Sequence, residues 1–266
     1  MTNDNKQSAK TVLITGASSG FGRAAALRLA QTAGQIILLA RRQSRLVELQ
    51  KVIEQTFPHV KVHSHAMDLR DDVAVDALPT ILPETFREVD LLVNNAGLAL
   101  GLNGAWECSL QEWDDMLMTN CRALVRLTRR LLPGMVERNR GHIINLGSVA
   151  GNWPYPGGNV YGATKAFVQQ FSRNLRCDLL GKNIRVTNIE PGMADTEFSL
   201  VRFSGDKAKA DKVYEGTRAL SAEDVAETIF WASSLPEHVN INTLEVMPVC
   251  QAWAPFAVNR EMASPD

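Results

Sequence analysis

Short apolar runs alternate with longer segments of helical spacing along most of this chain, and this alternation constrains the fold more than any other feature. Seven runs are typical of strands, at residues 11–15, 35–40, 60–66, 90–94, 142–146, 185–189 and 243–246. Several are apolar almost throughout, as expected for strands covered on both faces. Helical spacing marks residues 21–33, 45–57, 110–130, 163–180 and 222–235. The pattern predicts a parallel sheet with helices on both sides, which is a doubly wound α/β fold.

The chain shows no repeat, linker or change of composition that would divide it. Its 266 residues permit one domain or two at the usual domain length. We therefore expect a polar tail over residues 1–10 and a single domain over residues 11–266.

Composition and charge exclude several classes of function. Lys and Arg total 28 and Asp and Glu total 29, so the charge gives no reason to expect a nucleic acid or an anionic membrane as partner. No apolar run approaches the ~20 residues that cross a bilayer, and the polar start lacks the apolar core of a signal peptide. The four cysteines are scattered and form no metal-site spacing, so we expect no metal. These features favour a soluble cytoplasmic protein.

The first strand leads through a glycine-rich turn into a helix, with the sequence TGASSGFG at residues 15–22. Such glycines allow a tight turn, so that amides at the helix N-terminus can meet a pyrophosphate. A glycine-rich turn without a ligand is the alternative. The residues expected to contact a dinucleotide here are Gly16, Ser18, Ser19, Gly20, Phe21 and Gly22.

The second strand ends in Arg41 and Arg42, where an NAD-selective site would carry an acidic residue about 20 residues past the glycines. Two guanidinium groups can bind a 2′-phosphate, which favours NADP over NAD. Solvated charges at a helix start are the alternative. Residues at the ends of the next two strands complete the expected nucleotide site, namely Asp68, Leu69, Asn95, Ala96 and Gly97.

Tyr161 and Lys165 are four residues apart at the opening of a predicted helix and therefore share one face. Ser148 ends the fifth predicted strand, thirteen residues before Tyr161. A free tyrosine has a pKa of about 10, so proton transfer near neutrality needs a lower value, which a nearby ammonium and an oxidised nicotinamide favour. Ser148 can donate a hydrogen bond to a substrate oxygen as charge develops there. An ordinary surface Tyr and Lys is the alternative.

These motifs together resemble the short-chain dehydrogenase/reductase family over nearly the whole chain. The resemblance rests on the glycine loop, NNAG at residues 94–97, Asn120, Ser148, the Tyr161/Lys165 pair and Pro191-Gly192. It implies a Rossmann domain with a seven-stranded parallel sheet and hydride transfer between NADP and an alcohol carbon.

The family mechanism implies a role for each matching residue. Tyr161 would be the general acid/base, Lys165 would lower its pKa and hold the nicotinamide ribose, and Ser148 would bind the substrate oxygen. Asn120 would support a water in the proton relay. Near the nicotinamide, Pro191, Gly192 and Thr196 would bind the cofactor, Thr196 through the carboxamide.

The loop sequences resemble most closely the NADP-dependent 3-hydroxy acid dehydrogenases within that family. That resemblance implies oxidation of serine, allo-threonine and related 3-hydroxy acids, reduction of malonic semialdehyde to 3-hydroxypropionate, and assembly as a homotetramer. A reductase of neutral ketones or aldehydes is the main alternative, and a non-catalytic NADP-binding sensor is a second one.

An anionic substrate needs a positive partner, and Arg202 in the irregular segment of residues 191–211 is our candidate. Lys207 or Lys209 are the alternatives, and Trp153 and Tyr155 are candidate walls of the pocket. Four arginines on one helix, at positions 122, 126, 129 and 130, are expected to form a solvated or subunit-interface face. The apolar residues 247–253 are expected either at an oligomer interface or packed within their own subunit.

Overall fold

A computed structural model describes residues 10–253, which contain one seven-stranded sheet in the order β3-β2-β1-β4-β5-β6-β7. Every neighbouring pair of strands is parallel. The strands are β1 (Thr11–Thr15), β2 (Gln35–Ala40), β3 (Lys61–Ala66), β4 (Leu91–Asn94), β5 (Gly141–Leu146), β6 (Ile184–Pro191) and β7 (Thr243–Val246). This confirms the predicted fold class, and every predicted strand end lies within two residues of the observed one.

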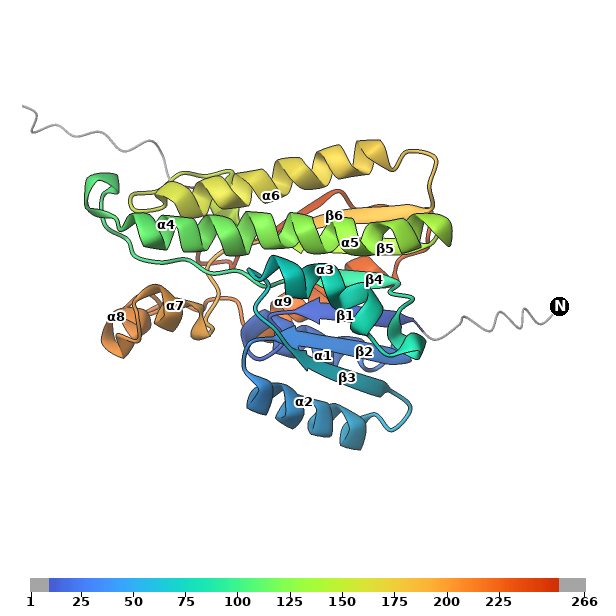
Figure 1. Cartoon of the computed structure of the whole chain (residues 1–266). Helices are drawn as coiled ribbons and strands as arrows, with labels where there is room; N and C mark the ends of the chain where they lie inside the picture. The colour runs from blue at the N-terminus through green and yellow to red at the C-terminus, as the bar shows by residue number, and fades with distance from the viewer. Residues whose placement is uncertain (1–9, 254–266) are drawn as a thin grey trace, which may run out of the picture.

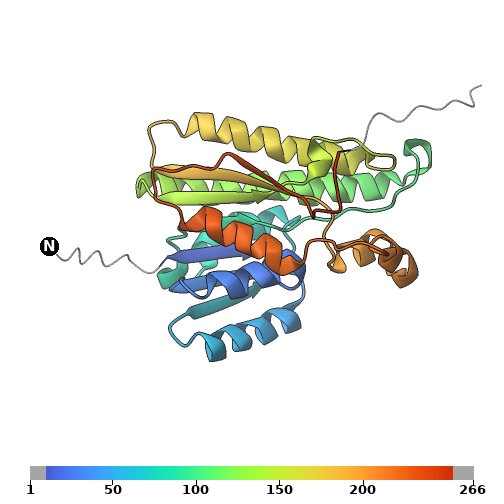
Figure 2. The ribbon, with the colours of Figure 1, turned by 180° about the vertical axis from the view of Figure 1, so that it is seen from behind.

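Helices cover both faces of the sheet, as Figures 1 and 2 show from opposite sides. One layer consists of α1 (Gly20–Leu29), α2 (Gln43–Thr56) and α9 (Ala222–Ser234). The other consists of α3 (Asp72–Ile81), α4 (Leu110–Leu117), α5 (Ala123–Glu137) and α6 (Asn159–Asp178). Successive side chains of β1 enter the two cores alternately, with Ile14 on one side and Leu13 on the other. The central strands β1, β2 and β4 are mostly apolar because both of their faces are buried.

The predicted helix over residues 110–130 is divided by a π-helical turn, Met118–Arg122, and continues as α5 to Glu137. Helix α6 begins at Asn159, four residues before its predicted start, so Tyr161 lies in its first turn. Helix α3 was not predicted, because Pro79 interrupts its pattern. Its start is stabilised by the side chain of Asp71, which accepts from the amides of Val73 and Ala74.

Residues 191–211, which we call the lid segment, were predicted to be irregular, but they contain α7 (Glu197–Arg202) and most of α8 (Lys207–Lys212). Thr196 caps α7 by accepting from the amide of Phe198, and Asp206 caps α8. Both helices lie beyond the carboxyl ends of the strands, apart from the two covering layers (Figure 1). A ligand in an open α/β fold binds at this end of the sheet.

The segment after β7 returns to the start of the lid segment in its own subunit. The amide of Gly192 donates to the carbonyl of Val246, and the amide of Met193 donates to Gln251 Oε1. The rings of Trp153 and Trp253 lie 5.6 Å apart. The predicted polar tail lies outside the described residues apart from Lys10, so the domain boundary stays a prediction. Between residues 10 and 253, no helix has the length and apolar character needed to cross a membrane.

Candidate active site

The glycine turn after β1 is tightly packed against the end of β4. Gly16 has a φ of +66° and Gly20 a φ of +51°, which favour glycine over other residues. A Cβ on Gly22 would lie 2.5 Å from both Asn95 Nδ2 and the Gly16 carbonyl oxygen. Asn95 Nδ2 donates to the Thr15 carbonyl at 2.8 Å, and the amides of Asn95 and Ala96 donate to Thr15 Oγ1. Asn95 and Ala96 therefore hold the turn in place.

This turn leaves the N-terminus of α1 open to a ligand. Ser19 is the N-cap residue of α1, and its side chain makes no capping hydrogen bond there. The first amides of the helix thus retain their capacity to bind an anion. Thr196, at the start of the lid helix α7, lies next to Gly20, since a Cβ on Gly20 would be 3.6 Å from Thr196 Cβ. The open amides of α1 would hold a dinucleotide phosphate, with Thr196 close to the same turn.

Arg42, which follows β2, lies at the glycine turn. Its guanidinium group donates to Ser18 Oγ and, at 2.7 Å, to Ser19 Oγ. It also binds the carboxylate of Glu197, which receives a second hydrogen bond from Arg45. Although partial burial raises the pKa of Glu197, these two arginines keep it below its usual value. The guanidinium groups of Arg42 and Arg45 and the hydroxyls of Ser18 and Ser19 therefore lie together beside α1.

Arg41 is exposed, and its charge contributes to the low pKa of Asp68. The carboxylate of Asp68 already accepts hydrogen bonds from Arg70, which are the main cause of that low pKa. Arg70 also binds Asp115 in the last turn of α4. Leu69 is 9% exposed and belongs to the hydrophobic core. The sequence did not predict the engagement of Asp68 by Arg70.

Tyr161, Lys165 and Ser148 come together at the carboxyl ends of β5 and β6. Tyr161 and Lys165 are each 8% exposed, and Lys165 Nζ lies 5.8 Å from the centre of the Tyr161 ring. Lys165 Nζ donates to the Leu146 carbonyl at 2.7 Å. Ser148 Oγ accepts from the amide of Ala150 and donates to the Pro191 carbonyl at 3.4 Å. The spacing of these residues in the sequence therefore corresponds to one site in space.

The protein alone does not produce the lowered tyrosine pKa that we expected. Burial raises the pKa of Tyr161 to about 12, and a hydrogen bond with Ser148 and the charge of Arg202 oppose this rise only in part. Burial also lowers the pKa of Lys165 to about 8. Burial is the largest cause of both pKa shifts, because it disfavours the charged phenolate and the charged ammonium alike.

Asn120 lies in the π-helical turn and is 2% exposed. Its Oδ1 accepts from the amide of Leu98, and its Nδ2 donates to the carbonyl of Leu98 and to Thr164 Oγ1. The amide group thereby fixes the segment after β4 to α6, and one acceptor position of Oδ1 is left for another donor. Gly97 lets this group and Lys165 approach, because a Cβ there would be 3.3 Å from Asn120 Oδ1.

Arg202, at the end of α7, reaches the Tyr161 side of the site. Its guanidinium carbon lies 5.6 Å from the centre of the Tyr161 ring. Nη2 donates to the Tyr155 hydroxyl at 2.8 Å and Nε to the Gly101 carbonyl at 3.1 Å. The alternatives Lys207 and Lys209 are mostly exposed and pair with aspartates of their own helix region.

The two predicted aromatic walls behave differently. Tyr155 contacts Arg202, whereas Trp153 donates to Glu245 and packs on Trp253. Phe198, which sequence reasoning missed, lies 5.7 Å from the Tyr161 ring. The signal for Phe198 was weak because α7 has only six residues.

Comparison with known proteins identifies the class. The profile of the short chain dehydrogenase family matches residues 10–206. The chain belongs to the short-chain dehydrogenase family of oxidoreductases, as the motifs indicated.

Individual relatives are similar over nearly the whole chain. Sulfoacetaldehyde reductase 2 of Chromohalobacter salexigens is 55% identical over 94% of this chain and 98% of the relative. The NADP-dependent 3-hydroxy acid dehydrogenase of Escherichia coli (strain K12) is 52% identical over 94% of this chain and 99% of the relative. The closed form of serine dehydrogenase complexed with NADP⁺ superimposes with a TM-score of 0.89 at 52% identity, over 94% of this chain and 99% of that structure.

Proposed function

We propose that this protein is an NADP-dependent dehydrogenase that moves a hydride between the nicotinamide and the hydroxyl-bearing C3 of a small 3-hydroxy acid. Serine, allo-threonine and 3-hydroxypropionate are the substrates that fit. The observation that carries the proposal is the position of Arg202, whose guanidinium group lies beside the ring of the buried Tyr161. A cation at that distance can bind the carboxylate of a substrate whose hydroxyl faces Tyr161 and Ser148.

The residues present fit NADP. The turn of Gly16, Gly20 and Gly22 would hold the pyrophosphate at α1. Arg42, with Arg41 nearby, would hold the 2′-phosphate. Further contacts would come from Ser18, Ser19, Phe21, Asp68, Leu69, Asn95, Ala96, Gly97, Pro191, Gly192 and Thr196. NADP⁺ supplies the hydride acceptor, and NADPH the donor in the reverse direction.

The protein's own residues handle the proton. In alcohol oxidation Tyr161 Oη, as phenolate, takes the substrate's hydroxyl proton, and in reduction the phenol returns it. Ser148 Oγ donates to the same substrate oxygen and stabilises its developing charge. Lys165 favours the phenolate by its charge and would bind the nicotinamide ribose. Asn120 would support a water that relays the proton.

A second candidate function is reduction of sulfoacetaldehyde. It is favoured by the 55% identity to sulfoacetaldehyde reductase 2 of C. salexigens. A sulfonate and a carboxylate are both compact anions, so Arg202 can bind either one.

The test is the absorbance of NADPH with purified protein, 3-hydroxypropionate or L-serine, and NADP or NAD in parallel. We expect fast reduction of NADP and little of NAD. 3-Hydroxypropionamide, which has a neutral amide in place of the carboxylate, serves as the matched neutral substrate. Faster turnover of the amide than of the acid would favour a neutral-carbonyl reductase, and faster reduction of sulfoacetaldehyde than of malonic semialdehyde would favour the second candidate.

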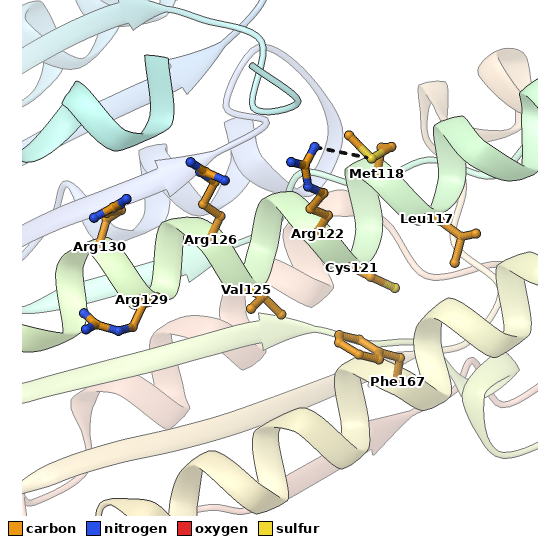
Figure 3. A pocket seen from close by; sticks show the side chains of 9 residues that line it. All are labelled: Leu117, Met118, Cys121, Arg122, Val125, Arg126, Arg129, Arg130 and Phe167. Carbon is orange, nitrogen blue, oxygen red and sulfur yellow. Dashed lines mark hydrogen bonds between the residues drawn. The ribbon is translucent and has the colours of Figure 1, made fainter. Parts of the chain in front are cut away.

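We also propose that the protein is located in the cytoplasm. In addition, we propose that it assembles as a homotetramer. A hollow between α4–α5 and α6 is lined by Leu117, Val125 and Phe167 (Figure 3). Leu117 is 45% exposed and Phe167 44% exposed, so this face gains from burial against a second copy. The cations along the helix are mostly engaged, since arginines 122, 126 and 130 bind aspartates of α3. Light scattering should give four times 29.3 kDa, and a monomeric mass would contradict the assembly.

A further inference from the structure

The guanidinium group expected to bind the 2′-phosphate is paired with a carboxylate of the chain itself. Glu197 Oε2 lies 3.0 Å from Arg42 Nη1, and Glu197 Oε1 lies 2.5 Å from Arg45 Nη1. The same Arg42 binds the hydroxyls of Ser18 and Ser19. Glu197 belongs to the lid helix α7, 155 residues from Arg42 in the sequence.

We propose that Glu197 is an internal competitor for the 2′-phosphate of NADP, so that arrival of this phosphate releases the start of α7. The proposal rests on NADP being the cofactor. A phosphate and a carboxylate that share the guanidinium group of Arg42 repel each other, so simultaneous binding of both is unfavourable. The Glu197 contact must therefore break before the phosphate binds fully. The apparent affinity for the phosphate is then the intrinsic affinity multiplied by the fraction of molecules in which Glu197 is released.

A single short helix, α7, connects Glu197 to the part of the site around Tyr161 where the substrate is expected. Glu197 is the first residue of α7 and Arg202 is the last. At its far end, Arg202 binds the Tyr155 hydroxyl and the Gly101 carbonyl, and the amide of Gly101 donates to the Arg202 carbonyl. The lid helix α7 is thus attached at one end to Arg42 and Arg45 and at the other to the loops around Tyr161. Loss of the first attachment leaves α7 held by Arg202, by the Ser199 hydroxyl on Tyr214 and by the packing of Phe198 on Tyr161.

The expected size of the effect follows from exposure. The side chains of Arg42, Arg45 and Glu197 are 40–44% exposed. Ion pairs this open to water are weak, so removal of the competitor should tighten phosphate binding by about three- to tenfold.

The test uses adenosine 2′,5′-bisphosphate, which carries the 2′-phosphate but no nicotinamide. The comparison compound is 5′-AMP, which lacks the 2′-phosphate. Calorimetry at low salt compares the full chain with Glu197→Gln. Glu137→Gln is the matched control, because it removes the same charge at the exposed end of α5. We expect Glu197→Gln to bind the bisphosphate three- to tenfold more tightly, with 5′-AMP unchanged and the control like the parent protein.

A second readout is hydrogen exchange of the amides in residues 198–203 of the parent protein. The bisphosphate should speed this exchange, and 5′-AMP should not. Equal or weaker binding of the bisphosphate by Glu197→Gln, or unchanged exchange, would overturn the proposal and leave NADP as cofactor. If the parent protein binds the bisphosphate no better than 5′-AMP, the NADP assignment fails and the competitor fails with it.

Discussion

Replacement of Arg202 by Met should change which substrates the enzyme accepts far more than how fast it handles a neutral one. Met keeps an unbranched side chain of similar length but removes the charge near Tyr161. In the structure the guanidinium group has two hydrogen-bond partners, the Tyr155 hydroxyl and the Gly101 carbonyl. Its Nη1 has no hydrogen-bond partner among residues 10–253, so a substrate carboxylate can use it.

The magnitude follows from the value of a hydrogen bond to a charged group, about 1.5–3 kcal/mol. Arg202 is only half-buried, so the lower part of this range applies. We therefore expect kcat/KM for 3-hydroxypropionate to fall about 10- to 30-fold. Loss of the two lid contacts should affect 3-hydroxypropionamide as well, but only about threefold, because those contacts do not distinguish the substrates.

The assay is initial-rate NADPH formation with both substrates, and the decisive quantity is the ratio of their kcat/KM values. Lys209→Met is the matched control, since it removes a lid cation that is 70% exposed and paired with Asp206. An equal loss of rate on the acid and the amide in Arg202→Met would refute the role of Arg202 as the carboxylate partner.

Three further predictions concern Arg42, the buried Lys165 and the buried Glu190. Arg42→Ala should weaken binding of adenosine 2′,5′-bisphosphate about tenfold and leave 5′-AMP unchanged in calorimetry, whereas equal weakening of both would contradict a phosphate contact. The folded-state pKa of Lys165 is about 8 against an ordinary 10.5, so the folded protein binds fewer protons than the unfolded chain between these values. The free energy of unfolding of the parent protein, taken relative to that of Lys165→Met in denaturant titrations, should therefore rise by on the order of 3 kcal/mol from pH 7 to pH 10.5. A difference between the two proteins that does not change with pH would contradict the lowered pKa. Glu190, 1% exposed, accepts from the side-chain amides of Gln169, Asn152 and Asn188. Glu190→Gln should lower the free energy of unfolding by about 1–3 kcal/mol, and a loss no larger than that of Glu137→Gln would count against this network.

The sheet and the central residues of the site could be predicted from the sequence because their signals are local. A strand buried on both faces is apolar throughout, so runs such as residues 35–40 stand out without knowledge of their neighbours. Tyr161 and Lys165 share a helix face, and the strand order places Ser148 beside them. The glycine turn is equally local, since the left-handed backbone of Gly16 and Gly20 requires those residues.

The contacts that were missed join residues far apart in the chain. Nothing near Arg42 indicates that Glu197 binds it, and nothing near Glu190 identifies Asn152 and Gln169 as its partners. The lid helix α7 is too short to show helical periodicity. The raised pKa of Tyr161 depends on how completely the folded chain surrounds the phenol, which the sequence does not display.

The central claim is that this family member oxidises a small 3-hydroxy acid with NADP. The most direct measurement is the kcat/KM for 3-hydroxypropionate and for 3-hydroxypropionamide with NADP, and for the acid with NAD, followed as nicotinamide absorbance. We predict that the acid is preferred over the amide at least tenfold and that NADP is preferred over NAD. Turnover of the amide at the rate of the acid, or equal rates with both cofactors, would contradict the account.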